Sequence, residues 1–308
     1  MSFDATPYYR DPARLRADYR EFHAAALASR DVDPTYPVYV ALADALGLDR
    51  PGRAWLVLVH VAYYHMGSAL AAFAGARTAD DACLAPLDLP VATERRAHWT
   101  RPRLAKHLAS VARAARPFGG DLAEWATCDL PDDPHKAWSV LNARLMTIDG
   151  NGRWAAFKTA EMLQQIVGVP VAAPDMGHAH SSGPRHGLAL LFPGAPTGHS
   201  AADVATLDRL SNGLVADLRH RGIDADIERT ETTLCDFHAL HDGRYYIGHD
   251  IDQMQSQLHA IQSPLTGHAV EARAAALPHA YLGEKNGWLG VNKARRGHYR
   301  RTGEVITR

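Results

Sequence analysis

Two glycines and an arginine stand close together in the stretch DGNGR at residues 149–153, between two segments with helical periodicity. Glycine lets the chain turn tightly, and the first backbone N–H groups of the second helix have no partner within that helix. Because a helix N-terminus carries partial positive charge, this turn is suited to binding a phosphate oxygen without contacting a base. A helical hairpin with no ligand is the alternative. The predicted DNA-binding residues are Gly150, Asn151, Gly152, Arg153 and Trp154.

Basic residues gather in two stretches of a chain whose formal net charge is only -1. Seven lie between Arg95 and Gly120 and six between Lys285 and Arg301, with no acidic residue in either stretch. Local basic patches on a neutral protein favour a polyanionic partner at one face. Two solvated helix surfaces would give the same pattern, so the charge alone leaves both interpretations open.

The composition is typical of a soluble globular protein, with 46% hydrophobic and 22% charged residues in 308. The longest apolar run, at residues 54–66, is too short to span a bilayer, and the N-terminal residues contain no apolar signal region. We therefore expect a cytoplasmic protein with no membrane partner. Cys83, Cys128 and Cys235 are far apart, which argues against a disulfide framework, a cysteine zinc site and a four-cysteine iron–sulfur cluster.

Helical signals dominate the segments that must position these groups. Apolar residues from Trp138 to Ile148 recur at helical spacing, and the following helix is expected to end at Gly168. The Asp242-Gly243 pair beside RYYIG predicts a short β-hairpin or extended segment near residues 230–252. We predict a mainly α protein with an N-terminal extension (1–34), a catalytic region (35–275, with the hairpin at 134–168) and a basic C-terminal segment (276–308).

The hairpin resembles the helix-hairpin-helix element of the DNA glycosylase superfamily. That element has an apolar residue, then Gly-x-Gly-Arg, then small residues at the start of the helix. Ile148, the GNGR sequence at 150–153 and the alanines at 155–156 match these positions. The resemblance implies a helix-hairpin-helix, glycosylase-like helical fold that flips its target base. Trp154 stands where lyase-type members have a lysine, which argues against amine-driven lyase chemistry at that position.

The same resemblance extends past the second helix. The superfamily has an apolar-Gly-x-Pro turn there and a catalytic aspartate five residues after the proline. Gly168, Pro170 and Asp175 match this pattern. The cysteine cluster that some members carry is absent from this sequence.

Three further stretches are similar to a smaller family, the phage amino acid:DNA transferases, also called α-glutamyl/putrescinyl thymine pyrophosphorylases. They are the aromatic-aliphatic stretch at 55–73, the stretch with Glu-Arg-Arg at 89–108, and the carboxylate-rich stretch at 228–252. The resemblance implies that an amine, such as an amino acid or a polyamine, replaces pyrophosphate on a 5-hydroxymethyl pyrimidine of double-stranded phage DNA. The reaction would take place in the infected bacterial cell.

This resemblance suggests roles for individual residues. Arginines would neutralise the leaving pyrophosphate, because a guanidinium pairs with phosphate through two hydrogen bonds. Carboxylates would accept a proton, bind the cationic amine or hold a magnesium ion, although we expect no cofactor and no bound metal. The predicted pyrophosphate-binding residues are Arg95, Arg96 and Arg101; the catalytic ones Asp175, Glu231 and Asp236; and the amine- or substrate-binding ones Tyr246, Asp250 and Asp252.

Structural explanations exist for the same residues. The arginines at 95–96 could start a surface helix, Asp175 could cap the next helix, and much of the carboxylate-rich stretch could be surface charge. Three other functions also stay open. A monofunctional DNA glycosylase would leave an abasic site, a DNA-binding module would do no chemistry, and an unrelated helical protein would not bind DNA at low salt.

Overall fold

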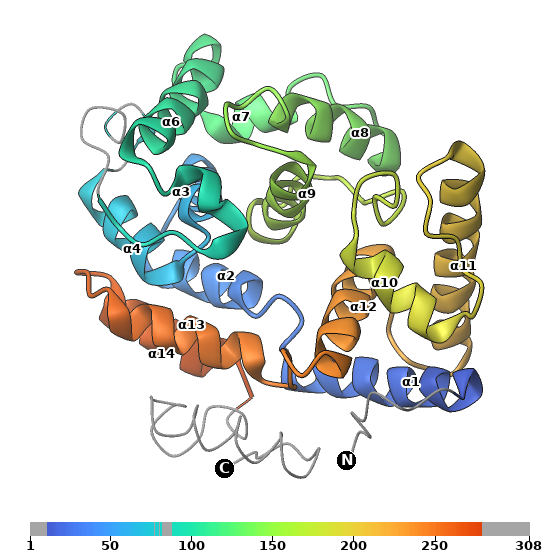
Figure 1. Ribbon diagram of the computed structural model, residues 1–308. Helices are drawn as coiled ribbons and strands as arrows, with labels where there is room; N and C mark the ends of the chain where they lie inside the picture. Colours follow the sequence, from blue (N-terminus) through green and yellow to red (C-terminus); the bar gives the residue numbers. More distant parts are fainter. Residues whose placement is uncertain (1–10, 77, 80, 82–87, 279–308) are drawn as a thin grey trace. The chain divides into compact units, whose positions relative to one another are not determined.

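The computed structural model describes residues 11–278, apart from residues 77, 80 and 82–87 (Figure 1). Contacts divide the chain into two units. Unit 1 comprises residues 1–34, 174–253 and 277–308, and unit 2 comprises residues 35–173 and 254–276. The predicted domains were consecutive stretches of sequence with boundaries after residues 34 and 275. Each of the two units instead combines segments that are far apart in the sequence. The basic stretch from Lys285 to Arg301 and Cys83 lie outside the described residues.

Unit 2 is a helical assembly around a buried central helix. Every residue of α3 from Ala54 to Tyr63 is buried, and α3 packs against α4, α6, α7 and α9. Asp49 caps α3 by accepting a hydrogen bond from the Gly52 N–H at 2.9 Å, with Pro51 in the first turn. The helices are α2 (Thr35–Ala45), α3 (Arg50–Tyr63), α4 (Met66–Gly75), η1 (Thr93–His98), α6 (Arg101–Ala115), η2 (Arg116–Phe118), α7 (Leu122–Thr127), α8 (Pro134–Leu145), α9 (Arg153–Met162), η3 (Leu163–Val167) and α14 (Thr266–Ala276).

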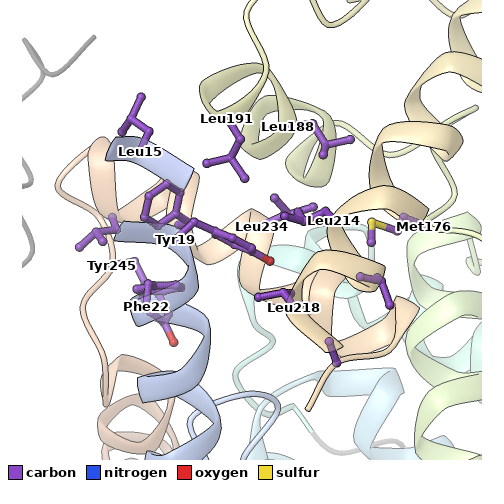
Figure 2. Close-up of a cluster of buried hydrophobic side chains, with 14 of the residues drawn as sticks. Leu15, Tyr19, Phe22, Met176, Leu188, Leu191, Leu214, Leu218, Leu234 and Tyr245 are labelled. Atoms are coloured by element: carbon purple, nitrogen blue, oxygen red, sulfur yellow. The ribbon is translucent and has the colours of Figure 1, made fainter. Parts of the chain in front are cut away.

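Unit 1 has its own hydrophobic core, to which helices far apart in the sequence contribute (Figure 2). Its helices are α1 (Pro12–Ser29), α10 (Gly183–Leu191), α11 (Ala201–His220) and α12 (Ile227–His241), and α13 (His249–Ala260) begins in unit 1 and ends in unit 2. Tyr19 and Phe22 of α1 are fully buried beside Leu188 of α10 and Leu234 of α12. The N-terminal segment is therefore part of this core.

Two glycines bring α10 and α12 unusually close. A Cβ added at Gly187 would lie 2.4 Å from the carbonyl oxygen of Leu234, and one at Gly183 would lie 2.4 Å from the Sγ atom of Cys235. The four-residue spacing of the glycines places both on one face of α10. Asp175 lies in the segment between η3 and α10.

The mainly α prediction is confirmed for the part of the chain that the structure describes, but the predicted β-hairpin or extended segment near 230–252 is wrong. Residues 227–241 form α12, which Asp226 caps through a 2.7 Å hydrogen bond from the Arg229 N–H. Gly243 has a φ of 68° and ends the helix, with the Arg244 N–H bonded to the Ala239 carbonyl at 2.8 Å. The Asp-Gly pair is therefore a helix C-terminus, which uses the same left-handed glycine as a hairpin turn.

Candidate active site

The turn between α8 and α9 and the first turn of α9 together contain the five predicted DNA-binding residues. Gly150 has a φ of 80°, which a residue with a side chain rarely adopts. Asn151 closes the turn, because its side-chain nitrogen donates to the Leu145 carbonyl at 3.1 Å. Gly152 is the N-cap of α9 and supplies no capping side chain. The first N–H groups of α9 therefore lack a side-chain acceptor at the N-cap, the arrangement that binds a phosphate oxygen.

Trp154 and Arg153 lie in the first turn of α9. The Trp154 side chain is 38% exposed, and its ring packs edge-on against Tyr64 with 4.7 Å between ring centroids. Arg153 is half-buried. The predicted group thus combines an open helix N-terminus, an adjacent cation and a partly exposed aromatic ring.

Arg95 supports this turn from inside unit 2. It is buried, and its guanidinium donates to the Gly150 carbonyl and to the Asn151 side-chain oxygen, both at 3.2 Å. Burial lowers the pKa of Arg95 to about 10, so it stays charged at neutral pH. The three predicted pyrophosphate-binding arginines therefore differ in their surroundings: Arg95 contacts the turn, whereas Arg96 and Arg101 are exposed.

Two buried histidines also pack against the α8–α9 turn. The His98 Nδ1–H donates to the Ala62 carbonyl and the His107 Nδ1–H donates to the Asp149 carbonyl, each at 2.7 Å. Burial and the Arg95 charge lower the pKa of His98 to about 4, and burial lowers the pKa of His107. Both rings are neutral at pH 7. A Cβ on Gly150 would lie 2.7 Å from His98 Nε2, so only glycine fits above this ring.

Part of the basic stretch after Arg95 is neutralised within unit 2. Asp149 pairs with Lys106 at 3.3 Å and with Arg113 at 3.1 Å. Arg101 and Arg103 at the start of α6 are exposed. The cationic surface next to the turn thus comes mainly from the beginning of α6.

A buried ion pair in α9 was not anticipated. Lys158 Nζ lies 2.8 Å from Glu161 Oε2, which also accepts a hydrogen bond from the Tyr36 hydroxyl at 3.0 Å. Lys158 stands one helical turn after Trp154, on the same face of the helix. The three-residue spacing of Lys158 and Glu161 was visible in the sequence, but nothing in the sequence indicated that the pair is buried.

In unit 1, the three predicted amine- or substrate-binding residues lie close together. The Tyr246 hydroxyl donates to Asp252 Oδ2 at 2.7 Å, and His249 Nδ1 lies 2.8 Å from Asp250 Oδ1. Burial lowers the pKa of His249, but the hydrogen bond to Asp250 and the charge of that residue outweigh burial and raise it overall. His249 was not among the predicted residues.

Asp31 belongs to the same cluster, although more than 200 residues separate it from the others in the sequence. It accepts hydrogen bonds from the Tyr245 hydroxyl and from the N–H groups of Gly248 and Ile251, at 2.5, 2.6 and 3.1 Å. Burial and the neighbouring Asp250 raise the pKa of Asp31 to about 7. Asp31 thereby holds the N-terminus of α13, and no sequence pattern around it indicated this contact.

The other predicted catalytic residues lie on α12 and in the loop before α10. Glu231 Oε1 lies 3.6 Å from the Sγ atom of Cys235, and the charge of Asp236 helps to raise the pKa of Tyr245, which burial raises most. Asp175 is exposed, and its Oδ1 accepts a hydrogen bond from the Gly177 N–H at 2.7 Å. Asp175 thus closes a local turn and does not cap α10, which begins at Gly183.

Among the described residues, no group of three or more His, Cys, Asp or Glu side chains is arranged to hold a metal ion. A search of the same residues finds no helix long and apolar enough to cross a membrane.

The model of one protein family, amino acid:DNA transferase, matches residues 27–246. The match includes the α8–α9 turn, the exposed arginines, Asp175 and α12. Asp250 and Asp252 lie just beyond its end. Members of this family are transferases that modify DNA with amino acids, and this chain belongs to the amino acid:DNA transferase family.

Proposed function

We propose that this transferase replaces pyrophosphate on a 5-(pyrophosphoryloxymethyl) pyrimidine of double-stranded phage DNA with an amine, either an amino acid or a polyamine. The amine enters as an ammonium ion and gives one proton to a carboxylate. Its lone pair then forms a bond to the exocyclic methylene carbon. The bond between this carbon and the pyrophosphate oxygen breaks, and pyrophosphate leaves with the electron pair of that bond. The product nitrogen carries the positive charge. No base is released, so the DNA strand stays intact.

The observation that supports this proposal is the α8–α9 turn together with η1, which contains Arg95. The turn presents the N-terminus of α9 with no N-cap side chain to occupy it, which suits a DNA phosphate. Because Arg95 is hydrogen-bonded to Gly150 and Asn151, the neighbouring Arg96 is held next to that turn. Arg96 and Arg101 are exposed and have the chemistry to neutralise a leaving pyrophosphate.

Carboxylates of unit 1 would serve the amine. A nucleophilic nitrogen must lose a proton before it attacks, and a positioned carboxylate is a suitable acceptor. We assign Asp175 this role because it is exposed and fixed by its own turn. The target base must leave the helical stack before its methylene group can be attacked, so we propose base flipping as the preceding step.

Mass spectrometry of nucleosides tests the proposal. DNA that contains 5-hydroxymethyluracil, pyrophosphorylated beforehand, would be incubated with the protein and a pool of amino acids and polyamines. We expect a new nucleoside in which one amine replaces pyrophosphate, with release of one pyrophosphate per nucleoside formed. DNA with unmodified thymine serves as the control and should give no product.

Two results would contradict the proposal. Free base with abasic sites would identify a DNA glycosylase. Unchanged nucleosides from DNA that the protein nevertheless binds would show that pyrophosphate on a pyrimidine is not the group this enzyme replaces.

A further inference from the structure

A histidine in unit 1 has a buried nitrogen that no described residue contacts. His178 lies three residues after Asp175 and is 1% exposed. Its Nε2 lies 2.7 Å from the Ser211 hydroxyl of α11, whereas its Nδ1 is buried and has no hydrogen-bond partner in the described part of the chain. Leaving a buried polar atom without a partner costs about 1–3 kcal/mol, so a ligand atom or a water that forms a hydrogen bond there would stabilise this region.

The hydrogen bonds of Ser211 indicate whether His178 Nδ1 is a hydrogen-bond donor or an acceptor. The Ser211 hydroxyl donates its single hydrogen to the Leu207 carbonyl at 3.0 Å. The bond to His178 must therefore be donated by His178 Nε2–H. Burial chiefly lowers the pKa of His178 to about 4, with Asp175 opposing and Arg185 adding to the effect, so the ring is neutral at pH 7. A neutral ring protonated at Nε2 has a lone pair at Nδ1, which makes Nδ1 a hydrogen-bond acceptor.

A second buried acceptor lies one helical turn away. Asp208 precedes Ser211 by three residues on α11, so both side chains leave the same face of the helix. Its Oδ1 is buried and accepts no hydrogen bond from the described residues. Burial and the charge of Asp175 both raise the pKa of Asp208. Asp175 itself is exposed.

Arg185, whose charge helps to lower the pKa of His178, already has partners within the chain. The Arg185 guanidinium donates to the Thr197 and Gly198 carbonyls and to His199. The two buried atoms near Asp175 that lack a donor in the described part of the chain, His178 Nδ1 and Asp208 Oδ1, are both acceptors. A donor with positive charge complements such a group, whereas a phosphate or a carboxylate would be repelled.

We propose that Asp175, His178 and Asp208 bind the primary ammonium group of the amine substrate and that Asp175 then accepts its proton. An ammonium group has three N–H donors, and the three side chains provide three acceptors. In the transfer step one N–H bond breaks, the proton forms an O–H bond with Asp175, and the electron pair stays on nitrogen for the attack. The proposal rests on the proposed function and specifies its amine site.

The cluster around Asp252 is a less suitable amine site. Its carboxylates already have donors within the chain, from the Tyr246 hydroxyl and from His249. Asp31 next to them is occupied by the Tyr245 hydroxyl and two backbone N–H groups. An ammonium group that binds these oxygens would have to displace those donors, whereas His178 Nδ1 and Asp208 Oδ1 have no donor to displace in the described part of the chain.

Two measurements on the full chain test this site. The first is calorimetric binding of putrescine and of glycine without DNA, and the second is the KM for each amine with saturating pyrophosphorylated DNA. Asp208→Asn keeps the shape of the side chain and should weaken amine binding and raise the amine KM by about 10- to 100-fold. His178→Phe should act in the same direction. Asp242→Asn, at an exposed carboxylate paired with Arg244 near the end of α12, is the matched control and should leave both values unchanged, with DNA affinity equal in all variants.

Amine binding or KM that changes in Asp252→Asn and not in Asp208→Asn would overturn the proposal. Equal values in wild type and Asp208→Asn would do so as well, because a site filled only by water gives that result. Failure of the proposed function is recognised separately: the wild type would then bind amine, Asp208→Asn would lose that binding, and no nucleoside product would form in either.

Discussion

The α8–α9 turn of unit 2 and the Asp175 loop of unit 1 are built in different ways. In the turn, the five residues predicted to contact DNA are consecutive, and glycines set its shape. Around Asp175, the partners come from a loop and from α11, about thirty residues apart in the sequence. The backbone forms the first site, while side-chain acceptors held by long-range packing form the second.

The two regions also differ in the charge that they offer a ligand. The turn has an open helix N-terminus, a neighbouring cation and neutral histidines beneath it, which together favour an anion. The Asp175 group offers acceptors only, which favours a cation. Under the proposed function the turn would bind the DNA and the Asp175 group would bind the amine, which are substrates of opposite charge.

The largest effect is expected at Asp175. Asp175→Asn removes the proposed proton acceptor and should lower the transfer rate by about 100- to 10,000-fold, with DNA affinity unchanged because the turn is intact. Asp242→Asn, at an exposed carboxylate near the end of α12, is the control and should retain full activity. Single-turnover transfer rates measure both, and a normal rate for Asp175→Asn would remove this residue from the chemistry.

Acid should destabilise unit 2 through its neutral buried histidines. The pKa of His60 is lowered to about 3 by burial and by His65, and that of His98 to about 4 by burial and by Arg95. The unfolded chain takes up protons near pH 6.5 and the folded chain does not, so stability falls as pH drops from about 6.5 towards 4. Each unit of pKa difference corresponds to about 1.4 kcal/mol, so the loss should reach several kcal/mol.

Urea unfolding at pH 7, 6 and 5 measures this loss. Asp31 acts in the opposite direction, because its raised folded pKa of about 7 makes the folded state bind more protons in the same interval. One carboxyl group does not offset the histidines, which include His107. A free energy of unfolding that is constant or rises from pH 7 to 5 would contradict the account of the support beneath the turn.

The two glycines of the turn provide a matched pair. Gly150→Ala places a Cβ 2.7 Å from His98 Nε2 at a φ of 80° and should cost about 2–4 kcal/mol of stability. At Gly152 a Cβ meets no atom within 4 Å, so Gly152→Ala should cost only about 1 kcal/mol, as a poorer N-cap. Thermal unfolding and DNA titration compare them. Equal destabilisation would show that His98 does not define the turn.

The smallest expected effect is on the salt dependence of DNA binding. It distinguishes Arg153, which we expect to contact DNA, from Arg95, which supports the turn. Arg153→Ala should reduce the slope of log affinity against log salt concentration by about 0.9, the value for one phosphate contact. Arg95→Gln should weaken DNA binding without changing that slope, because Arg95 is engaged by Gly150 and Asn151. A reduced slope for Arg95→Gln would make Arg95 a direct phosphate ligand.

The sequence predicted the parts of the molecule that depend on neighbouring residues. The helical character, the α8 and α9 segments and the glycine turn follow from local periodicity and caps. The β-hairpin prediction failed because Asp242-Gly243 suits a helix end as well as a hairpin, and only the contacts of α12 decide between them. Asp31, His178, His249 and Asp208 could not be identified, because burial and distant hydrogen bonds give them their properties and no local pattern records either.

The central claim is that the α8–α9 turn binds the DNA and the Asp175 group binds the amine. Two-substrate kinetics on Gly152→Ala and Asp208→Asn test it most directly. The account predicts that Gly152→Ala raises the KM for pyrophosphorylated DNA and leaves the KM for the amine unchanged. Asp208→Asn is predicted to raise the KM for the amine and to leave the KM for the DNA unchanged. If each variant changes both constants to the same extent, the two regions do not serve separate substrates and the account is contradicted.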